Sequence, residues 1–158
     1  MRMRLIYDSQ YGNTEKVAMA IAKVMQAHGE VTIARVGDVE PGQLAGLDLL
    51  VIGSPTHQFR ASETMRAFLQ SIPKDGLRGV KAATFDTRLT QAFLDKHPPL
   101  GFFEKIFGYA AGRIAKVIKE RGGKVVVPPE GFYVDDTPGP LVEGELERAE
   151  EWAGKLFA

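Results

Sequence analysis

Residues 3–14 read Met-Arg-Leu-Ile-Tyr-Asp-Ser-Gln-Tyr-Gly-Asn-Thr, and the change of character within this stretch decides the fold. Its first half is an apolar run of strand length, and its second half is a polar turn. A helical pattern follows over residues 14–28, in which one side of the helix carries Val17, Ile21, Val24 and His28. Gly29 predicts the end of that helix. A strand, a turn and a helix in this order are the opening unit of an α/β protein.

The same alternation continues along the chain. Further strands are predicted at residues 31–36, 47–52, 80–85 and 125–127, and further helices at 62–72, 110–121 and 142–157. The run at 47–52 is almost uninterrupted by polar residues, which indicates a strand that is buried on both faces. Residues 89–107 and 130–141 contain several Pro and Gly residues and are predicted to be irregular. We therefore predict one α/β domain over residues 1–158, with a five-stranded parallel sheet and helices on both faces.

The composition excludes several functions. Lys and Arg number 20, as do Asp and Glu, so the net charge is zero and no global field favours nucleic acid or an anionic membrane. The chain has no cysteine, which excludes disulfides and thiol chemistry, so any redox function needs a bound cofactor. No apolar run reaches the length of a membrane span or a signal peptide, and we expect a cytoplasmic protein. The last helix is expected to bury Val142 and Leu146 and to expose the acidic run 143–151.

The turn over residues 9–14 has the chemistry of a phosphate site. It combines hydroxyl and amide side chains with a glycine and the start of a helix, and it contains no Lys or Arg: Ser9, Gln10, Tyr11, Gly12, Asn13 and Thr14. Backbone N–H groups and the helix dipole can hold an anion without a cationic side chain. The alternative is an ordinary turn in which Asn13 or Thr14 caps the helix. A Walker A loop and the glycine pattern of a dinucleotide site are both absent.

Two further polar segments follow predicted strands. Gly53-Ser54-Pro55-Thr56-His57 comes directly after the buried strand, and Phe85-Asp86-Thr87-Arg88 comes at the end of the next one. Because ligands of parallel sheets bind at the carboxyl ends of the strands, both segments are expected to border the same site as the turn. His57 can face a ring, and Asp86 and Arg88 can bind the polar edge of a heterocycle. The alternatives are a strand-ending turn, a surface histidine and a surface ion pair.

With these three segments in this order, the sequence resembles the flavodoxin family over nearly its whole length. The resemblance implies a doubly wound parallel sheet in the order 2-1-3-4-5 and a bound FMN. It implies that the FMN phosphate is held by the hydroxyls of Ser9 and Thr14, the Asn13 side chain and the backbone N–H groups of residues 10–14. The isoalloxazine would be bordered by Ser54, Pro55, Thr56 and His57. The second flavin-contacting segment would be Phe85, Asp86, Thr87 and Arg88, with residues 86–88 on the pyrimidine edge.

The resemblance also implies aromatic rings against the isoalloxazine, from His57 or Phe59 on one face and from Phe93, Phe102, Phe103 or Tyr109 on the other. Residues 89–107 would form a lid or a docking surface. The predicted function is electron transfer between redox partner proteins or to a small electron acceptor. The alternative is an NAD(P)H-dependent FMN or quinone oxidoreductase that uses the same site. A receiver-type signalling domain shares this architecture but needs an aspartate after the third strand, where this chain has Gly53-Ser54.

Overall fold

The computed structural model describes residues 1–56, 61–136 and 138–158, and for residues 103–107 the backbone alone. Its centre is a parallel sheet of six strands. Five of the strands follow one another across the sheet in the order β2 (Glu30–Arg35), β1 (Arg2–Tyr7), β3 (Leu49–Pro55), β4 (Lys81–Leu89) and β5 (Lys124–Val125). The sixth strand, β6 (Glu130–Val134), also pairs with β4. The predicted order 2-1-3-4-5 is confirmed, and the structure adds one strand to the predicted five.

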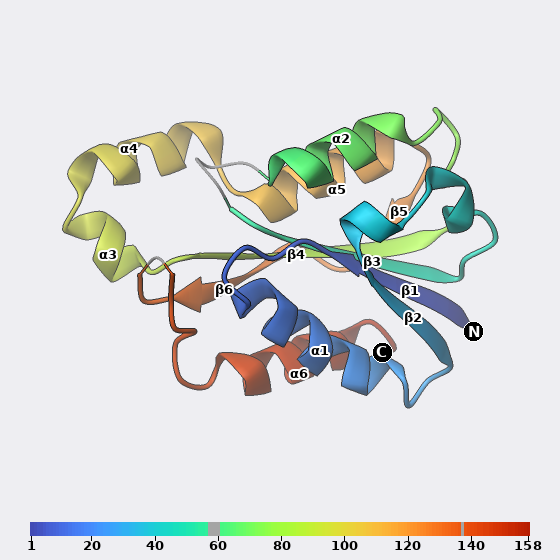
Figure 1. Cartoon of the computed structure of the whole chain (residues 1–158), viewed down its shortest axis with the longest axis horizontal. Coiled ribbons are helices and arrows are strands. Elements are labelled where there is room, and N and C mark those ends of the chain that lie inside the picture. Colours follow the sequence, from blue (N-terminus) through green and yellow to red (C-terminus); the bar gives the residue numbers. More distant parts are fainter. Residues whose placement is uncertain (57–60, 137) are drawn as a thin grey trace.

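The helices cover both faces of the sheet, which confirms the predicted α/β class (Figure 1). One face is covered by α2 (Glu63–Ser71) and α5 (Ala110–Glu120), and the other by α1 (Asn13–Met25) and α6 (Glu145–Lys155). Two short 3-10 helices, η1 (Val36–Asp38) and η2 (Pro41–Leu44), lie between β2 and β3. The connection from β4 to α5 contains α3 (Gln91–Asp95) and α4 (Pro98–Phe107). Within the described ranges, no helix is both long and apolar enough to cross a membrane.

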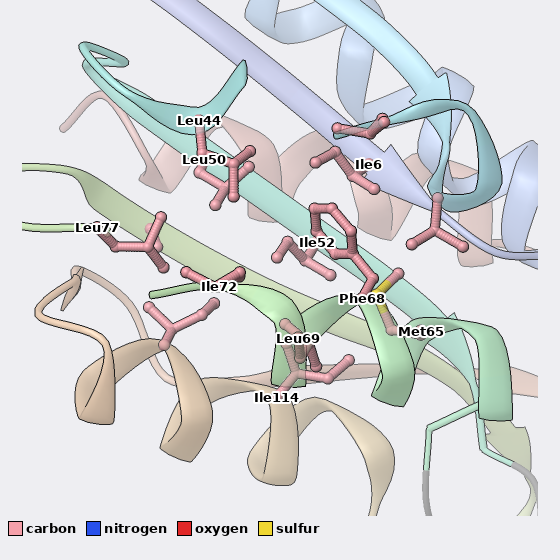
Figure 2. Packing of buried hydrophobic residues seen from close by; sticks show 14 of the residues in the cluster. Ile6, Leu44, Leu50, Ile52, Met65, Phe68, Leu69, Ile72, Leu77 and Ile114 are labelled. Carbon is pink, nitrogen blue, oxygen red and sulfur yellow. The ribbon is translucent and has the colours of Figure 1, made fainter. Parts of the chain in front are cut away.

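β3 is buried on both faces and contributes to both hydrophobic cores. Leu50 and Ile52 belong to the core beneath α2 and α5 (Figure 2), whereas Leu49 and Val51 belong to the core beneath α1 and α6. All residues from 49 to 54 are buried. The structure therefore confirms the predicted strand with two buried faces, which explains why its apolar run lacks the alternation of a half-exposed strand.

The core beneath α1 and α6 contains three aromatic rings from separate elements. Phe85 of β4, Phe132 of β6 and Trp152 of α6 meet edge to face, with ring centroids 6.1–6.2 Å apart. Each such pair adds about 0.5–1.5 kcal/mol to the free energy gained by burial alone. These contacts fasten the C-terminal strand and helix to the middle of the sheet.

Two prolines divide the predicted fifth strand into β5 and β6. Val125 pairs with Ala82, and Glu130 pairs with Phe85. The stretch from Val125 to Glu130 is therefore two residues longer than the stretch of β4 that it runs beside, and the two extra residues interrupt the pairing. Pro128 and Pro129 cause the interruption because they have no N–H group to donate to a neighbouring strand. The predicted strand at 125–127 is wrong in extent, and the predicted irregular segment 130–141 contains β6.

β4 is longer than predicted and continues through Leu89. Residues 85–88 therefore belong to the strand, and its predicted end at residue 85 is wrong. The irregular structure predicted over 89–107 is also wrong, because α3 and α4 occupy most of it. Thr90 caps α3 by accepting the N–H of Phe93 (3.1 Å), and α4 begins at Pro98. Proline fits the first turn of a helix, where the N–H groups have no helical partner.

α6 begins later than predicted, at Glu145, and this changes which side chains it buries. Leu146 is 39% exposed, so its predicted burial is wrong, and the inward positions are held by Ala149, Trp152 and Ala153. Glu145 was predicted to lie in solvent but is buried, and its carboxylate accepts the Tyr133 N–H (2.7 Å) and the Arg148 guanidinium (2.6 Å). Burial alone raises the pKa of Glu145, but the hydrogen bonds and the charge of Arg148 outweigh burial and lower this pKa.

We expect Glu145→Gln to lower the free energy of unfolding by about 1–3 kcal/mol at neutral pH, because Arg148 loses its charged partner. Glu145 contributes this stability above the ordinary glutamate pKa of about 4.3 and loses it as the pH falls through its lowered pKa. The difference from the wild type, measured by urea unfolding, should therefore shrink in acid. The control is Glu147→Gln at an exposed position of the same helix, which should change stability by less than about 0.5 kcal/mol. A difference as large at about pH 3 as at neutral pH would contradict the assigned ion pair.

Candidate cofactor site

The turn at residues 9–14, the end of β3 and the end of β4 meet at the carboxyl edge of the sheet (Figure 1). Gly53 of β3 lies in register between Tyr7 of β1 and Phe85 of β4. Just beyond this row, the Thr56 N–H donates to the Thr87 carbonyl (2.9 Å), which joins the ends of β3 and β4. This pairing places the turn at residues 9–14 beside the ends of β3 and β4, where the sequence predicts one ligand site.

The turn between β1 and α1 is shaped by a glycine and a serine. Gly12 is the N-cap of α1 and has φ 92°, a conformation that favours glycine. The Ser9 Oγ accepts the N–H groups of Gly12 (3.1 Å) and Glu15 (3.3 Å). The alternative in which Asn13 or Thr14 caps the helix is therefore wrong, because Asn13 is the first residue of α1 and Ser9 accepts the hydrogen bonds of the cap.

Four backbone N–H groups of this turn donate to no acceptor in the described part of the chain: those of Gln10, Tyr11, Asn13 and Thr14. Asn13 and Thr14 are the first residues of α1, where the N–H groups have no helical partner. The helix dipole adds about half a positive charge at the same end. The turn therefore offers several donors and a favourable potential to an anion.

The guanidinium of Arg35 holds the backbone of the turn. Arg35, at the end of β2, donates from Nη1 to the Ser9 carbonyl (3.1 Å) and from Nη2 to the Glu15 carboxylate (3.0 Å). The Tyr7 hydroxyl donates to the same carboxylate (2.6 Å), and burial, followed by Glu15, raises the pKa of Tyr7. Arg35 was not predicted from the sequence, and the signal that could have found it is the pairing of β1 with β2, which ends at Tyr7 and Arg35.

Two contacts with distant parts of the chain hold the start of α1. Thr14 is buried, and its Oγ1 lies 2.8 Å from the Oγ1 of Thr87 in β4. Asn13 donates from Nδ2 to the carbonyl of Pro138 (2.7 Å), in the loop between β6 and α6. Gly139 has φ 133°, a conformation that favours glycine, and a Cβ atom there would lie 2.7 Å from the same Nδ2 and displace the Asn13 side chain. The sequence identified this loop only as rich in Gly and Pro, and its contact with the turn was missed.

The end of β3 is held by internal hydrogen bonds. Ser54 is buried, and its Oγ accepts the Ser62 N–H (3.0 Å) and donates to the Pro55 carbonyl (2.9 Å). Ser62 caps α2, as predicted, and donates its hydroxyl to Asp8 (2.5 Å), a residue that sequence analysis did not select. An open depression of about 390 Å³ lies here, lined by Asp8, Ser9, Gln10, Pro55, Ser62, Glu63 and Thr64. His57, predicted to border the isoalloxazine, lies outside the described residues.

Asp86 and Arg88 form a buried ion pair on the α5 side of β4. Because side chains alternate along a strand, these two share one face while Thr87 points to α1 on the other. The Asp86 carboxylate accepts Nε (2.7 Å) and Nη2 (2.8 Å) of Arg88, and it also accepts the N–H of Ala111 (2.9 Å) at the start of α5. The Arg88 guanidinium lies 3.6 Å from the ring centroid of Tyr109.

The charges of this pair act mainly on each other. Burial raises the pKa of Asp86, and the hydrogen bonds and charge of Arg88 oppose that shift. Burial lowers the pKa of Arg88, but Asp86 outweighs burial and raises it. Asp86 has no exposed surface and its oxygens are already hydrogen-bonded, so it forms part of the wall beneath α5. The surface ion pair considered from the sequence is thus a buried one.

The predicted aromatic residues have different surroundings. Phe85 is fully buried, and its ring fills the space that a side chain at Gly53 would need. Phe93 stacks on His97, with ring centroids 4.3 Å apart, and Phe102 is 61% exposed. Tyr109 lies against Arg88, as described above, whereas Phe59 and the Phe103 side chain lie outside the described part of the structure. Among the described residues, no group of three or more His, Cys, Asp or Glu is placed to hold a metal ion.

Comparison with known proteins identifies the class. The family profile for flavodoxin matches residues 5–152, so the chain belongs to the flavodoxin family. Oxidised flavodoxin 1 from Bacillus cereus has a TM-score of 0.77 at 21% identity, over 99% of this chain and 97% of that one. A WrbA-like flavodoxin from Agrobacterium tumefaciens has a TM-score of 0.69 at 17% identity, over 98% and 93%.

A similar fold also occurs within a longer protein. Rubredoxin oxygen:oxidoreductase from Desulfovibrio gigas has a TM-score of 0.73 at 17% identity, over 99% of this chain but only 37% of that one. At these identities the solved structures establish the fold, and the chemistry of the site depends on the residues described above.

The buried ion pair depends on the absence of a side chain at Gly131 in β6, where a Cβ atom would collide with the Arg88 guanidinium. We expect Gly131→Ala to displace Arg88 from Asp86 and to lower the free energy of unfolding by about 2–5 kcal/mol, measured by urea unfolding. Gly154→Ala is the matched control. It lies within α6 with no atom near the new Cβ, and alanine should stabilise the helix there by about 0.5–1 kcal/mol. Equal effects of the two substitutions would contradict the role assigned to Gly131.

Proposed function

We propose that this chain binds FMN at the carboxyl edge of its sheet and transfers electrons between redox partners. The observation that carries the proposal is the set of N–H groups in the turn and at the start of α1 that have no acceptor among the described residues, in a member of the flavodoxin family. A monoester phosphate is a dianion that accepts several hydrogen bonds, and the first turn of a helix supplies such donors.

The proposed phosphate site consists of Ser9, Gln10, Tyr11, Gly12, Asn13 and Thr14. Its backbone N–H groups and the helix dipole would bind the phosphate, and the hydroxyls of Ser9 and Thr14 can add donors. Arg35 supports this site from behind, because it holds the Ser9 carbonyl and keeps the Glu15 carboxylate in an ion pair. Glu15 therefore adds little uncompensated negative charge near the phosphate.

The isoalloxazine would lie between the end of β3, with Ser54, Pro55, Thr56 and His57, and the end of β4, with Phe85, Asp86, Thr87 and Arg88. Ser54, Asp86 and Arg88 would act there mainly as a rigid wall, because their polar atoms are bonded within the protein. When bound, FMN would supply reversible transfer of one or two electrons, which no side chain of this cysteine-free chain supplies. A rigid wall limits the rearrangement that accompanies a change in the charge of a bound ligand.

The direct experiment is a titration of the purified protein with FMN, followed by its visible absorption and fluorescence. Saturable binding with a perturbed flavin spectrum would support the proposal, and the absence of binding would overturn it. Oxidation of NAD(P)H in the presence of a quinone then separates the two predicted activities. Rapid NAD(P)H oxidation without a separate reductase would show that the protein is an oxidoreductase at this site and not an electron carrier.

Two isosteric substitutions test the phosphate turn. Thr14→Val keeps the shape of a buried side chain but removes its hydroxyl, and we expect it to weaken FMN binding by about 1–3 kcal/mol, or about 5- to 150-fold in Kd. Thr87→Val is the comparison, because it removes the partner hydroxyl 2.8 Å away but leaves the turn intact. Since Thr87 is itself proposed to border the isoalloxazine, both variants are also titrated with riboflavin, which lacks the phosphate. If Thr14→Val weakens riboflavin binding as much as FMN binding, the Thr14 hydroxyl does not donate to the phosphate.

A further inference from the structure

The net charge of zero conceals a separation of charge between the two helical layers. Residues 61–81 and 110–124, which include α2 and α5, carry nine Lys and Arg against three Asp and Glu. Residues 130–158, which include β6 and α6, carry two Lys and Arg against eight Asp and Glu. α2 and α5 cover one face of the sheet, and α1 and α6 cover the other (Figure 1). α1 adds Lys16, Lys23 and Glu15 to the second face, so the layer of α2 and α5 is basic and the layer of α1 and α6 remains acidic.

A groove of about 430 Å³ lies between α2 and α5 on the basic side. Its lining combines the apolar side chains of Ala67, Ile114 and Val117 with two exposed cations, Arg66 and Arg113. Lys116 and Lys119 are exposed on the same helix as Arg113. An apolar centre with charged residues around it is the usual anatomy of a protein interface.

The groove lies next to the candidate cofactor site, and one residue lines both. Ala61 and Glu63 line the groove, and Glu63 also lines the depression that contains Asp8 and Ser62. Both surfaces therefore adjoin the start of α2, which is anchored to the end of β1 by the hydrogen bond from Ser62 to Asp8. A protein seated on the groove would lie beside the edge of the sheet where the cofactor is proposed to bind.

We propose that the face formed by α2 and α5 docks an acidic electron-transfer protein; the electron-transfer part of this statement rests on the function proposed above. The basic layer attracts a negatively charged partner and turns this face toward it during the encounter, which can raise association rates by about 10- to 1,000-fold at low salt. At physiological ionic strength the attraction acts over about 8 Å, so the partner must come close to the groove before it is captured.

Other occupants fit the surface less well. Nucleic acid would be attracted by the cations, but Glu63, Asp75 and Glu120 interrupt the basic surface and the groove has an apolar floor. A second copy could present its acidic α6 layer, and such a contact between two different faces would build a ring or an open filament of copies. Binding of nucleic acid or of a second copy to this face in preference to an acidic protein would overturn the proposal.

The test uses two small haem proteins of opposite surface charge, acidic cytochrome b5 and basic cytochrome c. Each is titrated into the isotope-labelled, FMN-loaded protein at low ionic strength, and amide chemical shifts report where it binds. We expect cytochrome b5 to perturb residues of α2 and α5 and to bind this face at least about tenfold more tightly than cytochrome c does. The affinity for cytochrome b5 should fall by at least about tenfold on raising the salt to 0.5 M.

Paired variants locate the effect. Lys116→Gln with Lys119→Gln removes two exposed charges without touching the candidate site, and Arg66→Gln with Arg113→Gln removes the cations of the groove. Each pair should weaken cytochrome b5 binding and slow electron transfer from the reduced protein to cytochrome b5 by about three- to tenfold. The control is Glu147→Gln with Glu151→Gln, which removes two exposed charges from the acidic layer. It should neither weaken cytochrome b5 binding nor slow electron transfer.

The outcomes separate this proposal from the proposed function. If FMN does not bind, the proposed function fails, while the shift titration can be repeated without it to test the docking face. If FMN binds normally but both basic pairs leave cytochrome b5 binding unchanged, the docking proposal fails alone. It also fails if cytochrome c perturbs α2 and α5 more strongly, if a short DNA duplex binds there more tightly than cytochrome b5, or if the protein self-associates in sedimentation at low salt and the basic pairs of substitutions abolish that self-association.

Discussion

The burial of β3 on both faces is the constraint on which the rest of the structure depends. Each fully buried side chain in its apolar run contributes about 1.5–3 kcal/mol, and this energy is available only if both helical layers are in place. Since β3 lies between β1 and β4 and all three are parallel, their carboxyl ends must emerge at the same edge. The strand that holds the two cores together thus also gathers the three polar segments.

The two sides of the candidate site differ in how their polar groups are used. On the β4 side, Asp86 is bonded to Arg88 and to the start of α5, so breaking this arrangement would leave a charge buried without a partner. On the α1 side, several N–H groups have no acceptor within the part of the chain that the structure describes; Arg35 holds the Ser9 carbonyl beside them, and Thr87 contacts the Thr14 hydroxyl. A rigid wall opposite a turn with free donors is an arrangement that is ready for a ligand before the ligand arrives.

The sequence predicted what depends on local pattern and missed what depends on tertiary contact. The strand order and class follow from alternating apolar runs and the family resemblance, and the cap at Ser62 follows from its position before an apolar stripe. The burial of Glu145 was missed, because only folding brings Tyr133 and Arg148 to its carboxylate. The roles predicted for residues in the site remain predictions, and Arg35 was missed because its contacts depend on strand pairing.

The hydrogen bond from Asn13 to the Pro138 carbonyl has a consequence for the order of events during synthesis. The turn that begins α1 is synthesised before its neighbour in the loop before α6, which lies 125 residues later in the chain. A nascent chain that carries only the first half of the sequence therefore lacks one side of the turn, and the contact at Asn13 can form only after the loop before α6 has been made.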